Sequence, residues 1–177
     1  MGPGSAARFG VWRLPRVRLL RPASQVQSVY AIDLRLLEAR GIRGMILDLD
    51  NTIVPWGTWS ATPELAAWIA AARDAGFRLC IVSNNAGPRV RHLAAALGLP
   101  AVAAALKPGR AALLRALRLL GTTPATTALV GDQLFTDILG GNRLGLHTIL
   151  VRPQSGREFP LTRLVRLAER LVLGPRS

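Results

Sequence analysis

The sequence from Met45 to Thr52 reads Met-Ile-Leu-Asp-Leu-Asp-Asn-Thr. A short apolar run of this kind is typical of a strand buried inside a sheet. The run ends in two carboxylates, Asp48 and Asp50, which lie two residues apart. We therefore predict a buried strand over residues 45–50 that carries a pair of acids to its carboxyl end.

Strand-like and helix-like segments alternate after this stretch. Thr62-Pro63, for example, provides a helix N-cap followed by proline at the first helical position. Strands are predicted at 45–50, 77–82, 100–103, 127–130 and 147–151, and helices at 63–76, 86–97, 108–121 and 133–144. This alternation predicts an α/β fold, a Rossmann-like doubly wound parallel sheet with helices on both faces.

Polar residues follow four of the predicted strands. In an open parallel sheet, ligands bind outside the carboxyl ends of the strands. Read singly, each of these residues could simply cap a helix or form a turn, but their recurrence at consecutive strand ends makes coincidence a poor explanation. Together they suit a divalent cation and a phosphate. The candidate site residues are Asp48, Asp50, Ser83, Asn84, Lys107, Asp132 and Asp137.

The paired acids suggest a division of labour. On an extended strand Asp48 and Asp50 would point the same way, about 6.6 Å apart, and both could face one reacting group. One could attack phosphorus while the other carries protons to the leaving group and from water. Asp132 adds a hard oxygen ligand of the kind that suits Mg²⁺. Ser83 and nearby backbone N–H groups could hold phosphate oxygens near a helix N-terminus.

Lys107 is the only lysine among 23 basic residues. Arginine therefore serves wherever a general positive charge is needed, and Lys107 invites a more specific role. A lysine ammonium is a compact point charge, whereas the arginine fork is planar and wider. The ammonium is the better group to bridge a carboxylate nucleophile and a phosphate.

These residues carry a resemblance to a known family. Asp48-Leu-Asp50-Asn-Thr52 resembles the DxDxT motif of haloacid-dehalogenase-like (HAD) phosphatases, and Ser83 matches their second motif. Lys107-Pro108 matches the third motif, and Gly131-Asp132-Gln-Leu-Phe-Thr-Asp137 the fourth. The finer spelling is similar to the YqeG-like group of subclass IIIA, which is related to the mitochondrial phosphatidylglycerophosphate phosphatases.

The resemblance implies a Mg²⁺-dependent phosphatase. It makes Asp48 the nucleophile, which passes through an aspartyl-phosphate, and Asp50 the general acid and base. It makes Ser83 and Lys107 phosphate ligands, to which we add the neighbouring Asn84 as a candidate. The implied Mg²⁺ ligands are Asp48, the carbonyl of Asp50, and Asp132, with Asp137 either a direct ligand or a support for the ligands.

The spacing between motifs leaves no room for an inserted cap domain. Between Asp50 and Ser83 lie 32 residues, most of them one predicted helix and a short flap, residues 53–62. Between Ser83 and Lys107 lie only 23 residues. An uncapped site suits a large, accessible phosphate. The two tryptophans of the flap could gate the entrance or simply pack on the core.

Charge divides the chain into three segments. Residues 1–43 form a basic N-terminal segment with one helix at 29–40, after an irregular stretch over 1–27. Residues 44–151 form the catalytic core. Residues 152–177 form a basic C-terminal helix and tail that we expect to pack on the core. The first segment has eight arginines against two acids and the last has six against two.

Composition excludes several classes of protein. One cysteine, Cys80, rules out a disulfide framework and a multi-cysteine zinc site. No apolar run approaches the roughly 18–20 residues that span a bilayer. We therefore expect a cytoplasmic protein, with peripheral contact at the inner membrane face as a further option for the amphipathic segment at 160–172.

The favoured substrate is phosphatidylglycerophosphate or another large phosphate. The basic ends suggest an anionic partner, either a phospholipid surface or nucleic acid, although solubility alone would also explain them. One alternative function is a phosphatase of nucleic-acid ends or phosphoproteins. Another is a basic RNA- or ribosome-associated binding protein with a vestigial site. Few aromatic residues are available for base stacking, 5% of the chain, which disfavours nucleic acid.

Overall fold

A computed structural model describes residues 18–154 of the 177-residue chain. Its centre is a parallel sheet of six strands in the order β1-β6-β5-β2-β3-β4. The strands are β1 (Ser24–Val26), β2 (Gly44–Leu47), β3 (Arg78–Val82), β4 (Ala101–Val102), β5 (Thr127–Gly131) and β6 (His147–Val151). The predicted doubly wound α/β fold is confirmed. The amphipathic segment at 160–172 lies outside the described residues.

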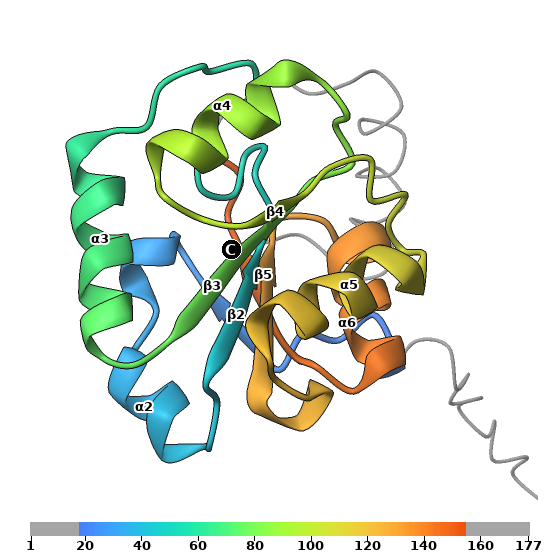
Figure 1. Ribbon diagram of the computed structural model, residues 1–177. Coiled ribbons are helices and arrows are strands. Elements are labelled where there is room, and N and C mark those ends of the chain that lie inside the picture. Colours follow the sequence, from blue (N-terminus) through green and yellow to red (C-terminus); the bar gives the residue numbers. More distant parts are fainter. Residues whose placement is uncertain (1–17, 155–177) are drawn as a thin grey trace, which may run out of the picture.

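Helices cover both faces of the sheet, with α3 and α5 on opposite sides (Figure 1). The helices are α2 (Leu34–Ala39), α3 (Pro63–Asp74), α4 (Pro88–Ala96), α5 (Arg110–Leu120) and α6 (Leu139–Leu144). Within residues 18–154 no cap domain is inserted, since a short flap precedes α3 and only α4 and β4 separate Ser83 from Lys107. No helix in this part of the chain is long and apolar enough to cross a membrane.

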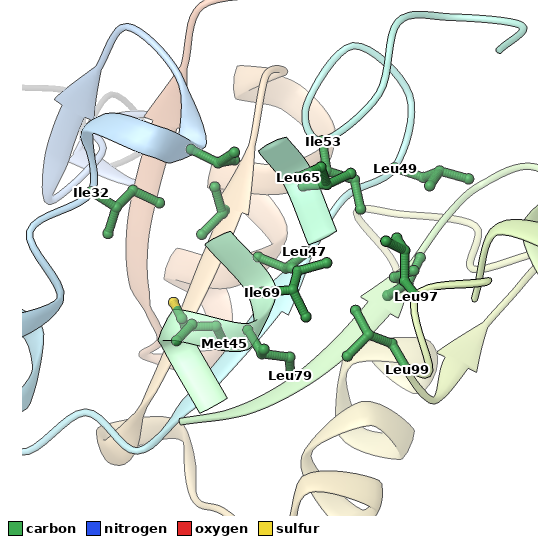
Figure 2. Packing of buried hydrophobic residues seen from close by; sticks show 14 of the residues in the cluster. Ile32, Met45, Leu47, Leu49, Ile53, Leu65, Ile69, Leu79, Leu97 and Leu99 are labelled. Atoms are coloured by element: carbon green, nitrogen blue, oxygen red, sulfur yellow. The ribbon is translucent and has the colours of Figure 1, made fainter. Parts of the chain in front are cut away.

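The central strands divide their side chains between two cores. Met45 and Leu47 of β2 pack with Leu65 and Ile69 of α3 (Figure 2). Ile46, the residue between them, belongs to the second core with α5 on the other face. This alternation follows from the period of two in a strand. Burying side chains on both faces explains why β2 reads as a continuous apolar run.

Cys80 lies in the second core and is fully buried. Burial raises the pKa of its thiol to about 12, so the thiol stays protonated at neutral pH. The thiol packs as a small apolar side chain, in keeping with its place in the apolar run Phe77–Val82.

Two expectations for the N-terminal part of the chain are wrong. Residues 24–26, expected to be irregular, form β1, which pairs with β6 at the edge of the sheet. The helix expected at 29–40 is interrupted: a 3₁₀ turn covers Val29–Ala31, and α2 starts only at Leu34. The interruption comes from Asp33, whose side chain accepts a hydrogen bond from the Leu36 N–H at 3.0 Å and caps a new helix.

The helix expected at 133–144 is also not uniform. Residues Leu134–Ile138 form a π-helical turn, and α6 follows it. The N–H groups of both Asp137 and Ile138 donate to the carbonyl of Gln133, at 3.0 and 3.2 Å. Such wide turns are rare and often occur at functional sites. This turn carries Asp137, whose side chain is buried toward the end of β5.

Candidate active site

The carboxyl ends of the central strands bring the predicted site residues to one edge of the sheet. Asp48 follows β2 directly, Ser83 follows β3, and Asp132 follows β5. Lys107 lies in the loop between β4 and α5. All four side chains are buried, although they are polar or charged. Burial of this kind is costly unless the groups pair with one another.

Lys107 is the centre of the charge network. Its Nζ lies 2.5 Å from Asp48 Oδ1 and 2.6 Å from Asp137 Oδ1, and it also donates to the Val82 carbonyl at 3.1 Å. Burial alone would lower the pKa of Lys107, but the carboxylates of Asp137 and Asp48 raise it above its ordinary value. Its three donors thus have three acceptors, and the group is an ammonium at neutral pH.

The surroundings of Asp48 disfavour the charged form of its carboxyl group. Burial raises the pKa of its carboxyl to about 6; the Lys107 ammonium opposes this shift, while Asp137 and Asp50 add to it. Its second oxygen accepts a hydrogen bond from the Thr52 hydroxyl at 3.1 Å. Thr52, which belongs to the same sequence motif, thus holds the carboxylate of Asp48 in place.

Three buried carboxylates gather where a cation could bind. One oxygen from each of Asp48, Asp132 and Asp137 lies within 4.8 Å of the others. An all-oxygen set of this kind suits a hard divalent cation. A cation here would also offset the repulsion between the three acids, two of which, Asp48 and Asp137, pair with Lys107. The residues present therefore fit the metal that the sequence predicts.

Asp50 is placed differently from the expectation. Strand β2 ends at Leu47, so the extended-strand geometry assumed for Asp48 and Asp50 does not extend to Asp50. The backbone turns instead, and Asp50 forms a single bridge with Val54. The carboxylate of Asp50 makes an ion pair with Arg89 of α4. The two acids therefore have separate cationic partners.

Ser83 and Asn84 shape the loop after β3. The Ser83 hydroxyl accepts a hydrogen bond from the Asn85 N–H at 3.1 Å, which fixes the turn that precedes α4. The Asn84 side-chain oxygen accepts from the backbone N–H of Lys107 at 2.8 Å. Asn84 thus ties the loop after β3 to the loop that presents the lysine. Both residues remain candidates for binding phosphate.

Gly131 allows Asp137 to come close to the end of β5. A Cβ atom at residue 131 would lie 2.3 Å from Asp137 Cγ, far inside van der Waals contact. Asp137 Oδ2 also accepts from the Gln133 N–H at 3.2 Å. The glycine before Asp132 therefore makes room for a neighbouring acid, which the sequence pattern alone did not reveal.

Two residues near the site were not identified from the sequence. Arg89 is buried in the first turn of α4. Gln154, beyond β6, donates from its side chain to the Thr52 carbonyl at 2.7 Å and from its backbone to the Asn51 carbonyl at 3.1 Å. The sequence signal for Arg89 was its position: it lies in a helix that starts just after a polar strand end.

Comparisons with known proteins find relatives of this chain. A family model described as HAD-hydrolase-like matches residues 104–165. The Bacillus subtilis protein named probable phosphatase YqeG is 40% identical over 152 residues, which cover 86% of this chain and 88% of that protein. Phosphatidylglycerophosphate phosphatase 1 of Arabidopsis thaliana is 29% identical over 161 residues. The match covers 86% of this chain but only 46% of the plant protein.

A solved structure supports the fold. The cobalt-bound deoxy-D-mannose-octulosonate 8-phosphate phosphatase of Haemophilus influenzae superposes with a TM-score of 0.52 at 20% identity. The superposition covers 63% of this chain and 69% of that protein. At this identity the likeness concerns the arrangement of strands and helices rather than the substrate.

Proposed function

The chain belongs to the family of HAD-like phosphatases, and on that premise we propose that it hydrolyses a phosphate monoester through an aspartyl-phosphate on Asp48. The observation that carries the proposal is the buried network in which Lys107 pairs with both Asp48 and Asp137. A buried carboxylate held beside an ammonium is suited to attack a phosphate whose negative charge the ammonium offsets.

The chemistry proceeds in two displacements. A carboxylate oxygen of Asp48 forms a bond to phosphorus as the bond to the leaving oxygen breaks, and Asp50 gives that oxygen a proton. Water then attacks the phosphorus of the aspartyl-phosphate, Asp50 takes the proton from water, and Asp48 is released with inorganic phosphate. Lys107 offsets charge on the phosphoryl oxygens, and Ser83 and Asn84 are proposed to bind them.

We propose Mg²⁺ as the cofactor, held by Asp48, Asp132, Asp137 and the Asp50 carbonyl. When bound, the cation would neutralise negative charge on the phosphate and on the acids around it. Support comes from the cluster of three buried carboxylates. The charge balance of the site favours a metal: Lys107 pairs with two of the three acids, Asp48 and Asp137, and a phosphate would add more negative charge.

The metal assignment predicts linked effects on stability and turnover. Chelation with EDTA should abolish phosphate release, and Mg²⁺ should restore it. A cation that binds only the folded state should raise the free energy of unfolding by ~2.7 kcal/mol at a concentration of 100 times its Kd. In Asp132→Asn this stabilisation should largely disappear, as measured by thermal unfolding with and without Mg²⁺. Equal stabilisation of Asp132→Asn and the wild type would contradict the ligand assignment.

We propose phosphatidylglycerophosphate as the substrate. A curated plant relative carries that activity in its name, and the uncapped site leaves room for a phosphate on a large carrier. Flap residues Trp56 and Trp59 are 41% and 54% exposed, and such amphipathic rings suit a membrane interface. Gln154, near the start of the basic C-terminal segment, donates from its side chain to the Thr52 carbonyl in the loop after β2.

Vesicles test the substrate assignment. We expect kcat/KM for phosphatidylglycerophosphate in vesicles to be at least about tenfold above that for p-nitrophenyl phosphate, or ~1.4 kcal/mol of transition-state discrimination. The aryl phosphate is measured in the presence of vesicles that lack the phospholipid phosphate, so that both assays contain the same surface. Equal or absent activity on the lipid would refute the lipid substrate and leave the phosphatase assignment intact.

The two alternatives predict different results. A phosphatase of nucleic-acid ends or phosphoproteins would prefer those substrates in the same assay. An RNA-binding protein with a vestigial site would bind RNA tightly, with a steep dependence on salt, and release no phosphate. The intact set of acids and lysine at the site argues against a vestigial role.

A further inference from the structure

We propose that Arg89 is a positioning residue that holds the general acid and base Asp50 and the flap (residues 53–62) together as one unit. The inference rests on the proposed role of Asp50 as proton donor to the leaving group. It concerns a residue outside the motifs that define the nucleophile, the phosphate ligands and the metal ligands.

One guanidinium bridges two parts of the site. Arg89 Nη2 forms an ion pair with Asp50 Oδ1, and Arg89 Nη1 donates to the Thr58 carbonyl at 3.0 Å. Asp50 belongs to the loop after β2, whereas Thr58 belongs to the flap that precedes α3. The planar fork of an arginine can reach two acceptors in different directions, which a lysine ammonium does less well. Arg89 thus joins α4, the flap and the loop after β2 that holds Asp50.

The two side chains of this ion pair differ in their access to water. The Arg89 side chain is 7% exposed, so its charge is largely withdrawn from water and depends on its partners. The side chain of Asp50 is 19% exposed, more than that of either Asp48 or Asp137. Asp50 is therefore more open to solvent than those two acids, and its ion pair with the buried Arg89 holds it in place.

The flap makes a second contact with the same helix. The ring of Trp59 lies 6.0 Å from the ring of His92, one turn along α4 from Arg89. The backbone N–H of Trp56 in the flap donates to the side-chain oxygen of Asn51, in the loop after β2, at 3.1 Å. Flap and helix are thus joined at neighbouring points. Loss of the Arg89 bridge should loosen the flap and free the Asp50 side chain together.

The test uses the dependence of rate on the leaving group. Glycerol 1-phosphate releases an alkoxide that needs a proton, whereas 2,4-dinitrophenyl phosphate releases a stable anion that does not. In Arg89→Gln we expect kcat/KM for glycerol 1-phosphate to fall by roughly 10²-fold, the usual contribution of a positioned general acid. We compare kcat/KM because it reports formation of the aspartyl-phosphate, whereas kcat also includes its hydrolysis, in which Asp50 acts in the same way for both substrates. The kcat/KM for dinitrophenyl phosphate should change little. A residue that only supported folding would reduce both rates equally.

Matched variants separate the explanations. Arg91→Gln makes the same substitution at an exposed position of the same helix and should leave both rates unchanged. Asp50→Asn should give the same selective loss as Arg89→Gln, and the double variant should be no more selective than Asp50→Asn alone. Acrylamide quenching of tryptophan fluorescence should increase in Arg89→Gln, because the flap loses its anchor.

Each outcome has a distinct meaning. Equal losses on the two substrates in a folded Arg89→Gln, or unchanged selectivity, would overturn the positioning role. If Arg89→Gln does not fold, Arg89→Lys keeps the charge and should shift selectivity in the same direction by a smaller factor; no shift would overturn the proposal. Absence of turnover by the wild type on every phosphate tested would instead refute the proposed function, so the two failures are distinguishable.

Discussion

Replacing Asp48 with asparagine should abolish turnover while leaving the protein folded. The amide has the size of the carboxylate but no nucleophilic oxygen, so the aspartyl-phosphate cannot form. Loss of a catalytic nucleophile elsewhere lowers kcat by roughly 10⁶-fold, and we expect a loss that reaches the detection limit. The measurement is phosphate release from p-nitrophenyl phosphate with Mg²⁺ present.

Although Asp48→Asn should lose activity, it should not lose stability. Burial raises the pKa of Asp48 to about 6 from 3.8, so the folded protein binds this proton more tightly than the unfolded chain does. The free energy of unfolding therefore falls as the pH rises from about 4 to about 6, and the loss is complete above that range. The asparagine side chain carries no charge to bury. Without metal at pH 7, Asp48→Asn should be at least as stable as the wild type.

The combined result separates catalysis from folding. The control is Asp74→Asn, the same change at an exposed position near the end of α3, which should retain activity. Activity that persists in Asp48→Asn and still depends on Mg²⁺ would refute the nucleophile assignment. A marked fall in the melting temperature of the metal-free variant at neutral pH would show that the charge of Asp48 stabilises the fold instead.

The sequence predicted the central part of the fold because local signals there agree with one another. Apolar runs, capping residues such as Thr62 and glycines after helices mark the same boundaries. The Thr62 hydroxyl does accept a hydrogen bond from the Leu65 N–H at 3.2 Å. The edge strand β1 has no such signal. Its sequence is Ser-Gln-Val, and among the described strands its backbone pairs with β6 alone.

The candidate site was predictable in outline for a similar reason. Residues at the ends of neighbouring parallel strands must meet, whatever lies between them in the chain. Two details depended on contacts that no local pattern encodes. One is the π-helical turn that brings Asp137 toward Lys107. The other is the pairing of Asp50 with Arg89, which lies 39 residues away in the sequence.

Replacing Lys107 with methionine should impair both stability and catalysis. Methionine has a similar length but no charge, so Asp48 and Asp137 lose their shared partner while they remain buried. Removing one member of a buried ion pair typically costs ~3–5 kcal/mol. Removing a charged donor that stabilises the transition state typically lowers kcat by roughly 10²–10³-fold. We expect a loss of stability of this size in urea unfolding and a loss of kcat of this size in phosphate release.

The pH dependence of the stability loss identifies its cause. The two acids raise the pKa of Lys107, so its stabilising ion pairs are at full strength at neutral pH. In Lys107→Met the unpaired acids can be neutralised by protons at low pH but not at high pH. The difference in unfolding free energy between variant and wild type should therefore be larger at pH 8 than at pH 5. Mg²⁺ should recover part of it.

Lys107→Arg tests whether the site needs an ammonium or only a positive charge. The chain has 22 arginines and this one lysine, and the lysine side chain is only 2% exposed. A guanidinium is wider and planar, and it cannot aim three donors from one nitrogen at Asp48, Asp137 and the Val82 carbonyl. We expect the arginine variant to recover more of the stability than of the activity. Wild-type turnover in Lys107→Arg would contradict this account, because any positively charged side chain at residue 107, in the loop after β4, would then suffice.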